Sequence, residues 1–121
     1  MPVQTIKVEV LSRNLNNFLK EKSIDKLDVI WMDVQGLELE ILQSSVEVIK
    51  NTKLIYLESE FRTIYKDQPL YPDIKKYLEE IEYKEIYNRV EYRPEYAKWD
   101  NWDYPGDTDS IFINLNECNR I

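Results

Sequence analysis

WMDVQGLELEIL, residues 31–42, is the stretch that decides the fold of this chain. It closes a dense apolar run, Leu27 to Met32, whose β-branched and aromatic members suit a strand buried on both faces of a sheet. The run ends on Asp33, and Gly36 allows a tight turn before a helix begins. We therefore predict a strand, a turn and a helix in succession, with Trp31 in the core.

Extended and helical patterns alternate on both sides of this stretch. Strands are predicted at 5–10, 27–32, 54–57, 83–92 and 110–115, and helices at about 12–22, 37–50 and 72–81. Residues 59–70 and 93–108 are expected to be loops, and Tyr56 is expected in the core. Buried strands separated by helices predict an α/β fold with a mostly parallel sheet, in which the last two strands form an antiparallel pair at one edge. The length predicts a single domain, residues 1–121.

The composition excludes several classes of function. The formal net charge of −7 argues against nucleic-acid or membrane-surface binding driven by charge. The chain has no histidine and one cysteine, Cys118, which excludes histidine-based nucleophilic catalysis, histidine-ligated zinc and an internal disulfide. Because no apolar run approaches the roughly 20 residues of a membrane span and no secretion signal is visible, we expect a cytoplasmic protein without membrane contact. Gly36 and Gly106 are the only glycines, too few for a glycine-rich phosphate or dinucleotide loop.

Acidic residues follow both apolar strands. Asp33 comes after the first strand, Glu58 ends the second, and Glu60 lies just beyond it. Ligands of open α/β sheets bind outside the carboxyl ends of the strands, so these carboxylates are candidates for binding a divalent metal, a sugar hydroxyl or a cationic ligand, or for a general base. The structural alternative is that Asp33 caps the next helix while Glu38 and Glu40 favour its dipole. The residues alone leave both interpretations open.

A second candidate is WDNWDYPGDTD, residues 99–109, which places aromatic residues among acids. Trp99, Trp102 and Tyr104 could stack on sugar rings. Alternatively they cover the sheet, because large aromatic side chains bury area wherever they can. Cys118 has no partner base in view and is expected to be an inert residue near the chain end.

Longer segments of the chain resemble a known family. LSRNLNNFLKEKSIDKLDVIWMDVQGLELEIL, residues 11–42, is similar to a short strand, a TLDDFL-like helix and the motif D-x-x-K-x-D-V-E/Q-G-x-E-x-x-x-L. The matching residues are Asp28, Asp33, Val34, Gln35, Gly36, Glu38 and Leu42. Residues 54–86 continue with a strand ending in glutamate, a Y-x-G-Q-P-L-like motif and a helix, and DTDSIFIN, residues 107–114, is similar to a DALFVN strand. Together they resemble the FkbM family of S-adenosylmethionine-dependent methyltransferases, with departures at Asp67, where glycine is common, and at Glu82-Tyr83, where Gly-Phe is common.

This resemblance implies a Rossmann-like class I methyltransferase fold that methylates a hydroxyl, often of a sugar or natural product. It implies that S-adenosylmethionine lies on the first strands of the fold, and that this chain is the C-terminal portion, lacking those strands. Asp33 and Glu58 are then expected as catalytic residues that position or deprotonate the hydroxyl. The residues expected to bind the acceptor are Gln35, Gly36, Glu38, Glu60, Trp99 and Trp102. No metal ligand is assigned.

The resemblance also implies an open edge. In the complete fold the strand at 27–32 pairs with the first strand, and an apolar edge without that neighbour is a pairing liability. We expect the edge to be covered by self-association, by strand 5–10, or by a separate chain carrying the first half of the fold. The second functional hypothesis is a truncated, non-catalytic relic or binding module, and the third is a glycan-binding surface on Trp99, Trp102 and Tyr104.

Overall fold

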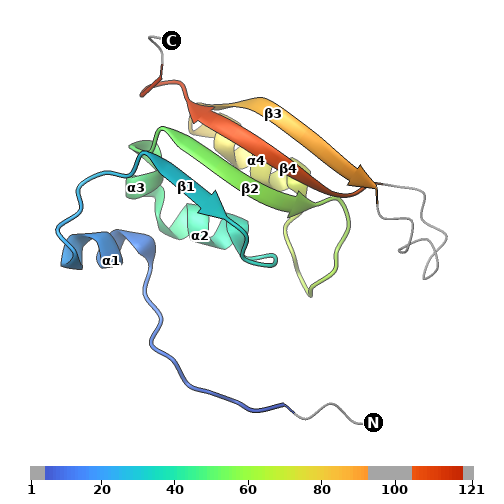
Figure 1. The fold of residues 1–121 in the computed structure, drawn as a ribbon, viewed down its shortest axis with the longest axis horizontal. Helices are drawn as coiled ribbons and strands as arrows, with labels where there is room; N and C mark the ends of the chain where they lie inside the picture. The colour runs from blue at the N-terminus through green and yellow to red at the C-terminus, as the bar shows by residue number, and fades with distance from the viewer. Residues whose placement is uncertain (1–4, 93–104, 119–121) are drawn as a thin grey trace.

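The computed structural model describes residues 5–92 and 105–118, in which helices and strands alternate along the chain (Figure 1). In chain order the elements are α1 (Leu15–Glu21), β1 (Val29–Met32), α2 (Glu38–Ser44), α3 (Val46–Lys50), β2 (Leu54–Glu60), α4 (Tyr71–Glu80), β3 (Tyr83–Tyr92) and β4 (Pro105–Asn114). The predicted α/β class is confirmed. None of the helices in these two ranges is long and apolar enough to cross a membrane.

The strands form one mixed sheet in the order β1-β2-β4-β3. Only β1 and β2 pair in parallel, while β4 pairs antiparallel with both β2 and β3. The antiparallel pairing of the last two strands is confirmed. β1, β2 and β3 run in the same direction, as a mostly parallel sheet requires, but only one of the three strand pairs is parallel. The reason is that β3 goes to the far edge and β4 returns between β2 and β3. The predicted loop at 93–108 is also too long, because residues 105–108 already belong to β4.

The core lies between the sheet and one layer of helices. Figure 1 shows α2, α3 and α4 on the same side of the sheet. Alternate residues of β2 are buried against this layer. The core consists of Met32, Leu42, Ile49, Ile55, Leu57, Ile74, Leu78, Tyr83 and Phe112. The other face of the sheet carries no helix from the described residues.

This one-sided arrangement overturns two expectations about β1. Trp31 is 76% exposed and lies on the open face, where its ring contacts that of Tyr56, which is partly buried, at a centroid distance of 4.7 Å. Of the four residues of β1, only Met32 is buried. The apolar content of this segment predicted a strand buried on both faces. In the structure only the face toward the helices is covered, and the described residues leave the other face open.

Two other predicted elements differ. Residues 5–10 are exposed and form no strand. The single helix expected to run to Lys50 is interrupted at Ser45, whose φ of −121° separates α2 from α3. The hydroxyl of Ser44 donates to the carbonyl of Ile41 at 3.2 Å, a side-chain bond to the backbone that competes with helical pairing.

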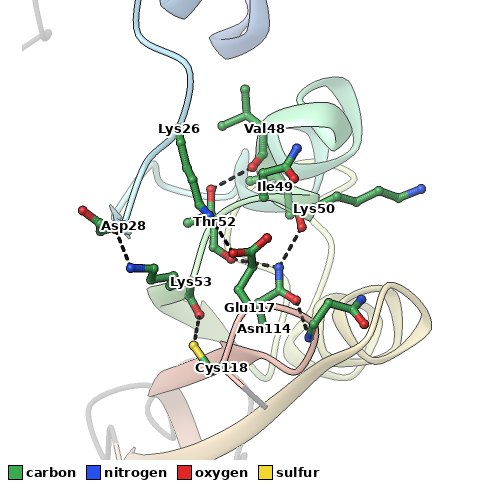
Figure 2. Close-up of polar contacts among 12 residues, drawn as sticks. Lys26, Asp28, Val48, Ile49, Lys50, Thr52, Lys53, Asn114, Glu117 and Cys118 are labelled. Carbon is green, nitrogen blue, oxygen red and sulfur yellow. Dashed lines mark hydrogen bonds and ion pairs between the residues drawn. The ribbon is translucent and has the colours of Figure 1, made fainter. Parts of the chain in front are cut away.

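Polar side chains fasten the end of the sheet where β1 and β2 begin (Figure 2). The amide of Asn114 donates to the carbonyl oxygens of Lys50 and Thr52, both at 2.9 Å. The hydroxyl of Tyr83 lies 2.5 Å from the carbonyl oxygen of Ile49 and 2.8 Å from that of Thr52. The turn between α3 and β2 is therefore held to β3 and β4.

The two departures from the family pattern fall where the backbone is left-handed. Asp67 has φ 55° and Glu82 has φ 68°. Glu82 follows Ile81, the C-cap of α4, a position where glycine is favoured because a β-carbon is strained at positive φ. The glycines common in the family at these positions would relieve that strain.

We predict that Glu82→Gly raises the free energy of unfolding. Glu82 is exposed, so the side chain contributes little packing. A left-handed residue costs about 1–2 kcal/mol, and the added freedom of glycine in the unfolded chain returns part of it, which leaves a gain of roughly 0.5–1 kcal/mol. Urea unfolding measures it. Lys76→Gly, at an exposed position in the middle of α4, is the control and is expected to destabilise. A loss of stability in Glu82→Gly would contradict the prediction.

We also predict a pH-dependent effect for Tyr83→Phe. The change removes the hydroxyl whose single hydrogen is shared between two carbonyl oxygens, and it should cost about 1–2 kcal/mol at neutral pH. Burial raises the pKa of Tyr83 above its usual value of 10.0, so the folded state holds the hydroxyl proton more tightly than the unfolded chain does. The contribution of this proton is therefore complete below pH 10 and is lost as the pH rises. Urea unfolding should show a smaller difference in the free energy of unfolding between wild type and Tyr83→Phe at pH 11 than at pH 8. An equal difference at both pH values would contradict this account.

Candidate functional site

The turn after β1 is tight and left-handed. The N–H of Leu37 donates to the carbonyl of Val34 at 3.4 Å, closing a four-residue turn. Its central residues, Gln35 and Gly36, have φ of 55° and 100°, the signs found in a type I′ turn. The turn delivers the chain to the first residue of α2 with Asp33 exposed at the sheet end.

A chain of hydrogen bonds runs from the next loop to Asp33. The hydroxyl of Tyr65 donates to Oε1 of Gln35 at 2.7 Å, and Nε2 of Gln35 donates to Oδ1 of Asp33 at 3.2 Å. The carboxylate of Asp33 is thereby oriented by its own turn and by the loop after β2.

Neighbouring side chains lie close to the α-carbon of Gly36 and leave little room for a larger residue. A β-carbon at this position would lie 3.2 Å from Cγ of Gln68 and 3.4 Å from Cδ2 of Tyr65. Gln68 is itself buried, and its Oε1 accepts hydrogen bonds from the N–H groups of Ile64 and Tyr65 at 2.9 and 3.1 Å. Gln68 therefore shapes the loop and presses it against the turn at the same time.

Glu38 stabilises the turn through its side chain. Its side chain is only 4% exposed, and Oε1 accepts from the N–H of Val34 at 3.4 Å. This contact ties the start of α2 back to the end of β1. The expectation that Glu38 binds the acceptor remains a prediction.

Carboxylates gather at the neighbouring strand end. One oxygen each of Glu58, Glu60 and Asp107 lie within 4.8 Å of one another, and Asp107 is buried. The strand register pairs Glu60 with Asp107, which explains their proximity. Because Met32 pairs with Leu57, Asp33 and Glu58 follow at the same level of adjacent strands. Carboxylate oxygens of this kind are ligands for hard cations such as Mg²⁺ or Ca²⁺.

The structure thus brings most predicted site residues to one end of the sheet. Asp33, Gln35 and Gly36 lie in the turn after β1, Glu38 begins α2, and Glu58 and Glu60 end β2. Trp99 and Trp102, with Tyr104, lie outside the described residues. Sequence reasoning missed Tyr65, Gln68 and Asp107. The motif from Tyr65 to Leu70 could have indicated the first two. Asp107 was missed because residues 93–108 were predicted to be a loop.

The family model for the methyltransferase FkbM domain matches residues 2–85, which include the turn, the loop and both parallel strands. The chain belongs to the FkbM methyltransferase family. Among curated proteins it is similar to the 2-O-methyltransferase NoeI of Sinorhizobium fredii (strain NBRC 101917 / NGR234), with 36% identity over 64 residues. This alignment covers 53% of the present chain but only 24% of NoeI, so the chain matches about a quarter of that relative. No solved structure matches the chain significantly.

FkbM methyltransferases use S-adenosylmethionine, and the described residues offer no cradle for it. A glycine loop holds a cofactor by leaving room beside the backbone. At Gly36 that room is filled by Gln68 and Tyr65. The other glycine, Gly106, is buried within β4. Neither glycine therefore leaves the open space beside the backbone that a glycine-rich cofactor loop provides.

We predict that Gly36→Ala and Gln68→Ala are energetically coupled. Gly36→Ala adds a β-carbon at positive φ and against Gln68, and should cost about 1–2 kcal/mol. Removing the Gln68 side chain should make Gly36→Ala less costly, so the double variant loses less stability than the two single variants together. Urea unfolding of all four proteins measures the coupling. Strict additivity would show that the contact does not constrain the turn.

Proposed function

We propose that this chain forms the acceptor side of an S-adenosylmethionine-dependent O-methyltransferase whose acceptor is a sugar or a related hydroxyl-bearing natural product. The observation that carries the proposal is the similarity to a 2-O-methyltransferase, taken with membership of the FkbM family. The sheet supports it, since the open edge of β1 is where the family resemblance expects the first strand. The chain would then correspond to the C-terminal portion of a class I methyltransferase sheet.

In this proposal Asp33 is the residue that meets the acceptor hydroxyl. Its carboxylate accepts the hydroxyl hydrogen bond and takes the proton as the oxygen becomes a nucleophile. Gln35 holds one carboxylate oxygen at 3.2 Å, so the other keeps a defined direction. Glu58 and Glu60 border the acceptor from the adjacent strand and accept hydrogen bonds from further sugar hydroxyls.

A second candidate function is a binding module without catalysis. The filling of the space beside Gly36 favours it, because the described residues retain a hydroxyl-binding edge without a cofactor cradle. Both functions share the acceptor site and differ in whether S-adenosylmethionine is bound.

We predict that Asp33→Asn weakens acceptor binding at least about tenfold, because a hydrogen bond to a charged group is worth roughly 1.5–3 kcal/mol. Nuclear magnetic resonance titration with methyl pyranosides bearing a free 2-hydroxyl, and with their 2-O-methyl counterparts, measures it through the amides of residues 33–36 and 58–60. Asp28→Asn is the matched control, since Asp28 precedes the same strand at its opposite end and pairs with Lys53. Equal affinity of both variants would remove Asp33 from the site.

Calorimetric titration with S-adenosylmethionine separates the two functions. Binding accompanied by turnover that falls at least about a hundredfold in Asp33→Asn would establish the methyltransferase. Glycoside binding without cofactor binding would favour the module. Absence of shifts at the carboxyl ends of β1 and β2 with every glycoside would contradict both.

A further inference from the structure

The outer edge of β1 has no strand beside it among the described residues. β1 pairs with β2 alone, and its other backbone edge faces a groove. The groove has a volume of about 990 Å³ and lies between β1, α2 and the start of α1. Its apolar lining includes Leu11, Phe18, Ile30, Met32, Val34 and Ile41. An open edge beside an apolar groove is the template on which an added strand forms.

The same chain contains a segment with the sequence pattern of a strand that forms no strand in the structure. Residues 5–10, TIKVEV, alternate polar and apolar, yet the structure gives them no partner in the described ranges. Ile6, Val8 and Val10 are 89%, 74% and 81% exposed. Three apolar side chains at a spacing of two lie on one face of an extended segment, and such a face is stable only when it is covered. The six residues are long enough to cover the four of β1.

The path of the segment favours a second copy over its own domain. Figure 1 shows residues 5–14 leading from α1 away from the sheet. They contain no glycine or proline at which the chain would turn back sharply, and Asn14 is already the N-cap of α1. Leu11 itself lines the groove, so little chain remains for a reversal. Residues 5–10 carry one lysine and one glutamate, so the segment adds no net charge to the repulsion between two acidic chains.

We propose that residues 5–10 of one copy add as a strand to the open edge of β1 in a second copy. Ile6, Val8 and Val10 enter the groove, while Lys7 and Glu9 face outward. The exchange is reciprocal, because both copies offer the same segment and the same edge, and it closes a two-fold symmetric dimer. The added strand occupies the edge of β1 that the family resemblance gives to the first strand, so this dimer and pairing with a first half of the fold are alternatives.

The test compares Val8→Asp with Lys7→Ser in the full chain. Both substitutions lower the net charge by one, but only the first places a charge in the groove. Sedimentation equilibrium over a concentration series at 0.15 M salt should show dimers for wild type and Lys7→Ser. Val8→Asp should dimerise at least about tenfold more weakly, since an unpaired charge is costly to bury. Val8 is exposed in the free chain, so this variant keeps the fold.

A synthetic peptide of residues 4–11 supplies the second measurement. It should bind the Val8→Asp chain, whose β1 edge is intact, and slow hydrogen exchange in the amides of residues 29–32. A monomeric wild type would overturn the proposal. Protected amides at residues 5–10 in that monomer would assign the segment to its own domain, and unprotected ones would leave the edge to a different partner. Equal dimerisation of wild type and Val8→Asp, or absence of peptide binding, would also overturn it.

Discussion

The packing of Gln68 against Gly36 is the contact on which the candidate site depends. It joins the turn after β1 to the loop after β2, two segments about thirty residues apart in sequence. The turn can approach so closely because position 36 has no β-carbon. Gln68 simultaneously bonds the backbone of its own loop, so the position of Tyr65 follows from the same contact. The direction of the Asp33 carboxylate is therefore set by packing as much as by hydrogen bonds.

Local patterns predicted the elements better than their surroundings. The helical stripe of 72–81 and the strand-like composition of 83–92 predicted α4 and β3 to within about a residue, because caps, prolines and periodicity act over a few positions. The burial of Trp31 was predicted wrongly, since apolar content cannot tell a strand covered on two faces from one covered on one. The place of β4 between β2 and β3 was equally invisible, because strand order depends on pairing between distant segments.

In the candidate site, too, local features were predictable from the sequence and contacts between distant segments were not. The acidic residues that end β1 and β2 were predictable because parallel strands bring their carboxyl ends to one edge. Asp107 was not, since its proximity to Glu60 follows from an antiparallel register that begins inside a stretch assigned to a loop. Gly36 was expected to allow a tight turn, which its φ of 100° confirms, and the side chain of Gln68 lies beside it. Its role in binding the acceptor stays a prediction. A glycine in a sequence indicates that another group lies close to the backbone there, but it does not indicate whether that group is a ligand or a side chain of the same protein.

The central position of β4 has a consequence for biosynthesis. β4 is last of the strands in chain order, yet it joins β2 to β3 and supplies Phe112 to the core. Until residues 105–114 have left the ribosome, one edge of β2 is exposed, β3 has none of its sheet pairing, and the sheet cannot be completed. Pairing between β2 and β4 spans about fifty residues, a high contact order that slows folding. The incomplete chain would be a natural substrate for chaperones that shield open strand edges during synthesis.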